Sequence, residues 1–437
     1  MSEVVIIGIV MAAFLLLLLA GLYIHSVLLV AGVAGLILLE GFDILVGLAG
    51  PQPFQRTASY TLTTIPLFVL MAQFILQAGI VKDLFYIVNR ASRGRRGVLG
   101  SLTLIAGSLL GAVSGSGTAT AASLGQVAVP ELRKHGFQAP LAGAVAATAG
   151  SMSGIIPPSI ILILYGVATE TSIGALFIGA VVPGMMVMAV FIGVMMYFLR
   201  RTRADVSEIR GDIALPESVG MREIITALMV SAAVVVVVFG GIYAGMVTPT
   251  EAGAIGAFAG FLAAGVLGRV NLRFMRTSLL ETVKVTVMVM LILIGALIFG
   301  RFVSLSLIPR RLMDALAPLV ETPFLMLIVL AVIFFVMFMF IEGAAVILMS
   351  VPVVFPIIVA MEIDVLWFGV FVGVICTIGL ITPPVGLSVY AVSGATGISS
   401  DGIFRYAMVF AAGAAIVVCG LLIAFPELAL WLPRRGG

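Results

Sequence analysis

Hydroxyl side chains and glycines occur together inside long apolar stretches at two places in the first half of the chain. These are residues 114–118, with the sequence SGSGT, and residues 153–158, with the sequence SGIIPP. Hard cations such as sodium prefer oxygen ligands, and hydroxyls with unwound backbone carbonyls supply them without a net charge in lipid. The alternative is that small residues allow close helix packing. The presence of two such segments favours an ion site with Ser114, Ser116 and Ser153.

The second half of the chain carries matching pieces. Glu342 and Gly343 lie in the stretch FIEGAA, and residues 379–384 read GLITPP. A carboxylate inside an apolar run is costly and is treated first as functional. Glu342 could serve an ion, a proton or the backbone of a hairpin, and the alternative is a wetted rim residue with no special task.

Arg301 follows a long apolar run and could hold a substrate carboxylate through two parallel hydrogen bonds. The alternative, that the arginine snorkels to the outer interface, stays open. Cys376 and Cys419 lie in apolar stretches and are interpreted as packing residues. The two histidines, His25 and His135, are isolated and show no metal-ligand spacing.

Composition decides the class of protein. Of 437 residues, 23 are Lys or Arg and 20 are Asp or Glu, so charged residues make up 10% of the chain, against roughly 25% in soluble domains. A soluble enzyme or nucleic-acid binder could not cover its surface with so few charges. Apolar runs also exclude an outer-membrane barrel, whose strands alternate. The sequence therefore predicts a polytopic α-helical membrane protein that binds no nucleic acid.

Basic segments orient the predicted helices. Arg90, Arg93, Arg95 and Arg96 mark a cytoplasmic loop, and Arg133 and Lys134 mark another. The apolar segment between them, 98–131, is interrupted by SGSGT, and its arms of about 12–15 residues are too short to cross the membrane. It is predicted to be a re-entrant hairpin. The N-terminal run is interpreted as a retained helix, further helices are expected at 222–243 and elsewhere, and counting gives ten crossings with both termini outside.

Residues 139–171 form the first predicted broken helix, interrupted near Pro157 and Pro158. A second hairpin at 322–360, flanked by the acidic Glu321 and Glu362, and a second broken helix at 365–395 repeat the pattern. The two regions align with one offset (343 − 117 = 226), and the shared residues are concentrated in glycine and proline. Because the two hairpins open from opposite sides, the repeats are predicted to be inverted. Such pairs of broken helices indicate a secondary transporter.

The chain resembles the large membrane subunit of tripartite ATP-independent periplasmic (TRAP) transporters. The resemblance is carried by GSMSGIIPPSIILILYGVATETSIGALFIGAVVPG, by the preceding GAVSGSGTATAAS and by GLITPPVGLSVYAVSG. It implies an ion-transporter-superfamily fold of the elevator type, with scaffold helices at 1–97 and 201–310 and a transport domain at 98–200 and 311–430.

The same resemblance implies sodium sites. The first would use Ser114, Ser116, Ser153, Ile156 and Pro158, and the second would use Gly379, Thr382 and Val385 near Gly343. Position 153 is usually glycine in the family and is serine here. The substrate would lie close by, with Ser116, Glu342 and Arg301 as candidate ligands.

The resemblance also implies partners and a location. A small four-helix membrane subunit and a periplasmic substrate-binding protein would act with this chain in the bacterial inner membrane. The expected function is sodium-coupled import of an organic acid such as sialic acid or a C4-dicarboxylate. One alternative is a stand-alone sodium/carboxylate symporter of the same fold. A membrane-embedded enzyme is disfavoured because the sequence holds no HExxH motif and no Ser/His/Asp set.

Overall fold

The computed structural model describes residues 2–43, 58–114, 116–201, 236–315 and 323–435, with scattered positions between 220 and 233. Every regular element among these residues is a helix, which confirms the predicted all-α fold class. Within the described part of the chain, five helical runs are long and apolar enough to cross a membrane: Tyr60–Gln77, Ile173–Arg201, Leu272–Leu305, Gly343–Ala360 and Ser400–Ala424. Shorter apolar helices accompany them, and the count of ten crossings stays a prediction. Seven residues of the predicted helix at 222–243, and Glu321, lie outside the described residues.

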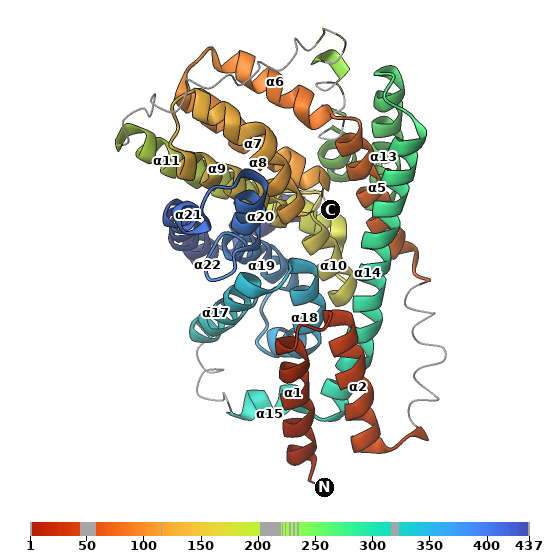
Figure 1. The fold of residues 1–437 in the computed structure, drawn as a ribbon. Coiled ribbons are helices and arrows are strands. Elements are labelled where there is room, and N and C mark those ends of the chain that lie inside the picture. The colour runs from red at the N-terminus through yellow and green to blue at the C-terminus, as the bar shows by residue number, and fades with distance from the viewer. Residues whose placement is uncertain are drawn as a thin grey trace.

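A first set of helices, here called the peripheral group, packs around the longest helix. It comprises α1 (Glu3–Leu19), α2 (Ile24–Glu40), η1 (Tyr60–Thr63), α5 (Thr64–Gln77), α13 (Pro249–Val266) and α14 (Leu272–Leu305). Helices α2 and α14 approach closely because Gly32 lacks a side chain: a Cβ there would lie 2.7 Å from the backbone nitrogen of Phe299. Helix α14 runs along one side of the molecule (Figure 1).

The first hairpin is entered through a short amphipathic helix. Helix α5 stops at Gln77 because Gly79 takes a left-handed conformation, and α6 (Ile80–Ser92) follows directly. The hairpin arms are α7 (Arg96–Ser114) and α8 (Gly117–Lys134). Their lengths of 19 and 18 residues exceed the expected 12–15, because the helices extend outward through their basic ends. The Arg96 guanidinium donates to the Gly136 carbonyl, so both ends of the hairpin lie together.

The remaining helices form a second set, called the hairpin group together with α7 and α8. The first broken helix is α9 (Ala139–Ser151), η2 (Met152–Gly154) and α10 (Ile160–Thr169), followed by α11 (Ile173–Arg201). After α15 (Ile308–Ala315), the second hairpin is α17 (Pro323–Phe340) and α18 (Gly343–Ala360). The second broken helix is α19 (Val365–Gly379) and α20 (Leu387–Thr396). The chain ends in α21 (Ser400–Ala414), the π-helical turn η4 (Ala415–Cys419), α22 (Gly420–Ala424) and α23 (Glu427–Arg435).

The internal repeat extends beyond the two regions in which the sequence showed it. Helices α8 and α18 begin 226 positions apart (343 − 117), and so do α9 and α19 (365 − 139). Starts within two residues of the same offset also relate α2 to α13, α6 to α15, α7 to α17, α10 to α20 and α11 to α21. The described chain is therefore two structurally equivalent halves.

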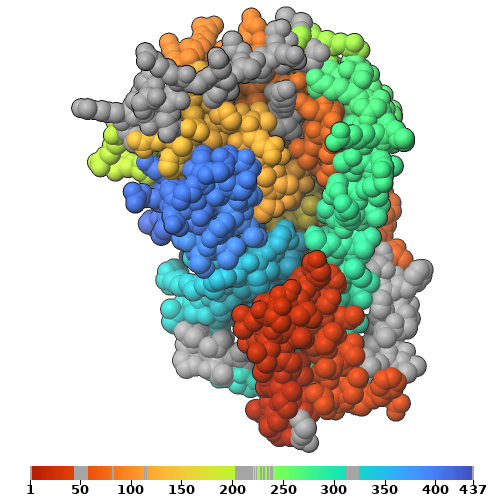
Figure 2. Space-filling view, viewed as in Figure 1, coloured from red at the N-terminus to blue at the C-terminus, as the bar shows by residue number. Residues whose placement is uncertain are grey.

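The halves are interlocked and oppositely oriented. Helix α6, which leads into the first hairpin, and α15, which precedes the second, lie at opposite ends of the molecule (Figure 1). Helix α8 of the first hairpin packs on α20 of the second broken helix, and α18 packs on α10. Figure 2 shows the first of these contacts, with the residues around 390–410 in blue directly beside the first hairpin in orange-yellow. Each hairpin is thus supported by the other repeat.

Candidate functional site

The tip of the first hairpin is built by a serine cap. The Ser116 hydroxyl accepts a hydrogen bond from the Ala119 N–H (3.4 Å) at the start of α8. Ser114 lies at the end of α7, where its hydroxyl donates to the Gly111 carbonyl (3.2 Å) and lies within hydrogen-bonding distance of the Thr120 hydroxyl. Hydroxyl oxygens have two lone pairs, so these bonds leave further acceptor capacity at the tip.

The tip of the second hairpin carries a carboxylate in the equivalent place. Glu342 is the N-cap of α18 (342 − 116 = 226), and its Oε2 accepts from the Ala344 N–H (3.0 Å). A negative charge at a helix N-terminus is stabilised by the unpaired N–H groups and the helix dipole. The Glu342 side chain is exposed. The repeat therefore places a serine cap at one tip and a glutamate cap at the other.

The first break contains a buried hydroxyl that the protein does not use. Ser153 in η2 is 2% exposed, and among the described residues its hydroxyl has no hydrogen-bond partner. Its neighbour Ser159, at the start of α10, donates to the Gly154 carbonyl (3.1 Å). A Cβ on Gly117 would lie 3.0 Å from Ser153 Oγ, so the tip of the first hairpin is in close contact with the first break. The Ser153 oxygen is not among the fully enclosed unpaired side-chain atoms, so it can be reached from the small cavity that Ser153 lines.

The second break is hydrogen-bonded to the second hairpin and packs closely against it. The Gly386 N–H donates to the Met339 carbonyl at the end of α17 (3.2 Å), and a Cβ on Gly379 would lie 2.5 Å from Cβ of Phe338. The Thr382 hydroxyl donates to the Ile378 carbonyl (2.7 Å), which leaves both of its lone pairs free for a cation. Val385 is half-buried beside it.

Both tips and both breaks meet at one small cavity of about 10 Å³. Its lining residues are Gly117, Thr118, Ser153, Gly154, Ile161, Glu342, Gly343, Cys376 and Leu380. The volume is close to the space that one water molecule needs. Gly343 leaves room at this point, because a Cβ there would lie 2.4 Å from Cδ1 of Ile161 and would force that side chain to shift. The sequence-predicted residues Ser153, Glu342 and Gly343 are thus brought together, across 190 positions (343 − 153).

Other predicted residues lie around this meeting point or away from it. Ile156 and Pro158 belong to the first break, but neither lines the small cavity. Arg301 lies near the end of α14, is exposed, and lines neither the small cavity nor the larger one described next. Within the described residues the structure therefore does not bring Arg301 to the hairpin tips.

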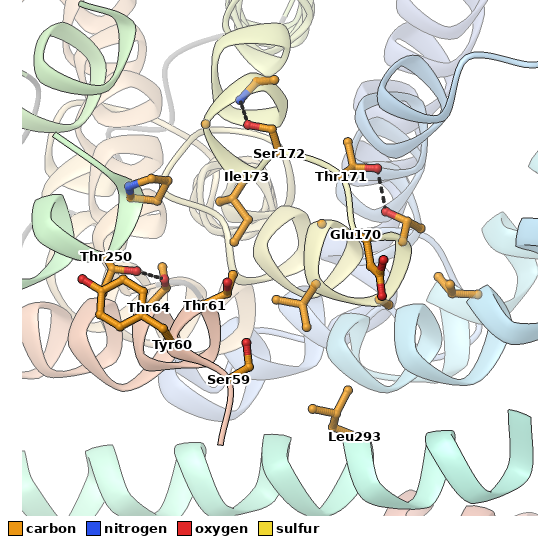
Figure 3. Close-up of a pocket in the computed structure, with 18 of the residues that line it drawn as sticks. Ser59, Tyr60, Thr61, Thr64, Glu170, Thr171, Ser172, Ile173, Thr250 and Leu293 are labelled. Atoms are coloured by element: carbon orange, nitrogen blue, oxygen red, sulfur yellow. Dashed lines mark hydrogen bonds between the residues drawn. The ribbon is translucent and has the colours of Figure 1, made fainter. Parts of the chain in front are cut away.

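A larger cavity of about 1420 Å³ lies between the peripheral group and the hairpin group. Its polar wall comes from η1 and α5, from the segment joining α10 to α11, and from the start of α13. Figure 3 shows Ser59, Thr61 and Glu170 around this space, with Leu293 of α14 on the opposite side. The Thr64 and Thr250 hydroxyls form a hydrogen bond (2.6 Å) at one edge.

These hydroxyl residues were not among the site residues predicted from the sequence. The signal was present in two similar strings, ATETS at 168–172 and TPTE at 248–251, each followed by an apolar helix. Thr248 and Glu251 form a capping box at α13, so this string looks like an ordinary helix start. Only the fold shows that the two strings lie on one cavity.

Comparison of the sequence with known proteins identifies one family of membrane transport proteins. The family model for the DctM component of the tripartite ATP-independent periplasmic transporter matches residues 11–428. A C4-dicarboxylate TRAP transporter large permease of Pseudomonas aeruginosa is 33% identical over 81% of this chain and 82% of its own length. The sialic acid TRAP transporter large permease of Vibrio cholerae is 31% identical over 96% of both chains. The solved Alcanivorax borkumensis YdaH transporter has a similar fold, with a TM-score of 0.65 at 15% identity over 95% of this chain and 99% of that one.

Proposed function

The chain belongs to the DctM family of TRAP transporter large permeases, and on that premise we propose that it imports an organic acid with an inward sodium gradient. The protein is an integral inner-membrane transport protein rather than an enzyme. Its relatives are named for C4-dicarboxylate and sialic acid, so a carboxylate is the proposed substrate class.

The observation that supports ion coupling most directly is the unpartnered Ser153 hydroxyl at the meeting point of the two repeats. Hydroxyl and carbonyl oxygens are the ligand chemistry that sodium takes, and the small cavity is sized for a single small species. We assign Ser114, Ser116 and Ser153 to a first sodium site, with carbonyls of Ile156 and Pro158. Gly379, Thr382 and Val385 form the proposed second site.

The proposed movement is that of an elevator, in which the hairpin group shifts against the peripheral group. The interlocked packing of α8 on α20 and of α18 on α10 supports a hairpin group that moves as one body. The large cavity lies along the boundary between the two groups. A periplasmic binding protein and a small four-helix membrane subunit are the proposed partners, as in the family.

The test is uptake into proteoliposomes that contain the chain with its small subunit and binding protein. Uptake of the binding protein's ligand is expected to require sodium outside, with no accumulation when choline or potassium replaces it. Equal accumulation without a sodium gradient would contradict the proposal. Uptake that persists without any binding protein would instead favour the stand-alone symporter.

The role of Arg301 as a substrate ligand stays a prediction, and its exposure away from both cavities supports the snorkelling alternative. Arg301→Lys separates the two roles, since lysine snorkels equally well but cannot copy a two-point contact. Loss of most uptake would assign Arg301 to the substrate, whereas unchanged uptake would assign it to the interface.

A further inference from the structure

Helix α6 joins the peripheral group to the first hairpin along one end of the molecule (Figure 1). It follows α5 in the chain, precedes α7, and packs on both α7 and α8. If the two helix groups shift against each other, as proposed above, α6 can stay with only one of them. The contacts at the two ends of α6 indicate which attachment is harder to break.

The N-terminal end of α6 is fixed by a buried ion pair. Arg269, which follows α13, donates to both oxygens of the Asp83 carboxylate (2.6 and 3.3 Å) and to the Ala78 carbonyl after α5 (2.5 Å). Gly79 makes room for the guanidinium, because a Cβ there would lie 3.2 Å from Arg269 Nη1. The Asp83 side chain is 4% exposed, so breaking this pair would leave a buried carboxylate without its partner. The angle between α5 and α6 is therefore held firmly.

The equivalent helix of the second half is attached to the same helix group. Helix α15, the counterpart of α6, pairs with α1 of the peripheral group through Arg311 and Glu3. Both of these side chains are exposed, so this ion pair is weaker than the one at Asp83. In both halves, the helix that precedes the hairpin is thus joined to the peripheral group by an ion pair.

The C-terminal end of α6 is held to the first hairpin by a contact that costs less to break. Asn89 donates to the Glu131 carboxylate of α8 (2.5 Å), and Lys134 donates to the same carboxylate (3.2 Å). Glu131 therefore keeps a charged partner after Asn89 leaves. The neighbouring side chains Phe85 and Val88 are buried and apolar, and apolar burial is non-directional. The hydrogen bond is thus what fixes the position of α6 along the hairpin.

The turn between α6 and α7 can absorb a change of backbone direction. Arg93 and Gly94 both have positive φ angles (49° and 72°), and both are exposed. Hinges are a few residues at the ends of elements that take up changes in φ and ψ. Gly79, at the other end of α6, also has a positive φ, but the Arg269 guanidinium lies beside it. The hairpin end of α6 is therefore the end that is free to bend.

We propose that α6 stays with the peripheral group and that the Asn89–Glu131 hydrogen bond is a releasable contact, which breaks each time the first hairpin shifts. This inference rests on the proposed function and identifies where the two groups separate at the basic end of the protein. Asn89 and Glu131 are positioning residues, which hold the hairpin in its present place and lie away from the hairpin tips. The buried Asp83–Arg269 pair stays intact during the movement.

A reversible cross-link across the contact tests the proposal. In a Cys419→Ala background, the pair Asn89→Cys/Glu131→Cys is joined with a short bifunctional methanethiosulfonate, and the full chain is reconstituted with its small subunit and binding protein. Uptake is expected to fall in proportion to the cross-linked fraction and to return after reduction. Sodium should still raise the melting temperature of the cross-linked chain, because the hairpin tips are unchanged.

The matched control is a cross-link inside the hairpin group. The Tyr406 hydroxyl of α21 donates to the side-chain oxygen of Gln138, which precedes α9 (2.7 Å). Both helices belong to the hairpin group, so the pair Gln138→Cys/Tyr406→Cys should keep its uptake after cross-linking. Loss of uptake in both pairs would show that the effect comes from the reagent and would overturn the inference.

Spin-label distances give a second measurement that leaves both contacts of α6 in place. Labels are introduced in pairs at three exposed positions: Arg90 in α6, Gln126 in α8 and Arg273 in α14. Between positions 90 and 273 the distance distribution should have one maximum, with and without sodium. Between positions 90 and 126 it should have two, because the hairpin moves and α6 does not. The reverse pattern, or one maximum for both pairs, would overturn the inference.

The cross-linking result also separates this inference from the proposed function. Full uptake by the cross-linked Asn89→Cys/Glu131→Cys protein would mean that α6 and α8 move together. If that uptake is still driven by sodium, only the releasable contact is refuted. Uptake that needs no sodium gradient but is blocked by the cross-link would refute only the sodium coupling.

Discussion

Ser153 is the residue at which sequence and structure point most clearly to ion chemistry. The residue is 2% exposed, lines the small cavity and has no hydrogen-bond partner among the described residues. The serine adds a side-chain oxygen to the backbone carbonyls of this break. We therefore expect Ser153 to strengthen sodium binding without being needed for the fold.

Replacement of Ser153 by alanine is expected to raise the sodium concentration for half-maximal uptake by about tenfold, the effect of losing one good oxygen ligand. The melting temperature without sodium should not fall, because the hydroxyl has no protein partner to lose. Ser151→Ala is the control: Ser151 lies two positions before Ser153, and its buried hydroxyl donates to the Thr148 carbonyl (2.9 Å). If both variants behave alike, Ser153 has no special role.

Glycines at the contact of α8 with α9 give a second test at the residue scale. A Cβ on Gly150 would lie 2.6 Å from the Ala121 backbone nitrogen. Because the clash is with backbone, it cannot be relieved by rotating a side chain. Gly150→Ala should destabilise the protein by about 1–3 kcal/mol through overpacking, measured as a lower melting temperature. Gly193 in α11 has nothing within 4 Å of its Cβ position, so Gly193→Ala should be neutral or stabilising. Equal melting temperatures would show that α8 and α9 are less closely packed.

Among the elements, α6 connects the two helix groups at the basic end of the protein. Its Asp83 is 3% exposed and receives two hydrogen bonds from the Arg269 guanidinium (2.6 and 3.3 Å). Arg269 also donates to the Ala78 carbonyl (2.5 Å). Further along α6, Asn89 donates to Glu131 of α8 (2.5 Å). Helix α6 is therefore hydrogen-bonded to the peripheral group at one end and to the first hairpin at the other.

Arg269→Ala would leave the Asp83 carboxylate buried without its partner, which costs about 3–5 kcal/mol in comparable cases. We expect a lower melting temperature and faster proteolysis at the basic loop around Arg93. The control is Lys284→Ala, which breaks the exposed pair with Glu281 and should cost less than about 1 kcal/mol. A similar loss of stability in both variants would mean that α6 is not anchored through Asp83.

At the scale of the whole molecule, the opposed orientation of the two halves makes a prediction about sidedness. Arg95 precedes the first hairpin, Glu362 follows the second, and Ser172 lines the larger cavity just before α11 begins; all three are exposed. Cysteines introduced singly at these positions, in a Cys419→Ala background, should react with an impermeant maleimide from defined sides. Position 95 should label only from the cytoplasm, whereas positions 172 and 362 should label from the outside. Labelling of 95 and 362 from one side would refute the inverted repeat.

What could be predicted from the sequence follows from properties that single residues carry. Scarcity of charge excludes a soluble fold, whatever the packing. The proline pairs and glycines prevent regular helix, so the breaks near Pro157 and Pro383 could be located, and their common offset revealed the repeat. The family resemblance then led to Ser114, Ser153, Thr382 and their neighbours as candidate ion ligands.

The tertiary structure alone decided which of these residues meet. The tips at Gly117 and Gly343 line one cavity because the two halves of the chain pack against each other. Contacts between residues so far apart in the sequence cannot be predicted from the local sequence around either tip. The same reason explains two further differences. Arg301 had the right chemistry but lies on a helix surface away from both cavities, and the hydroxyls near Thr171 and Thr250 resembled ordinary helix starts. The sequence specifies which chemical groups the protein has, whereas the surrounding helices determine which cavity or surface each group faces.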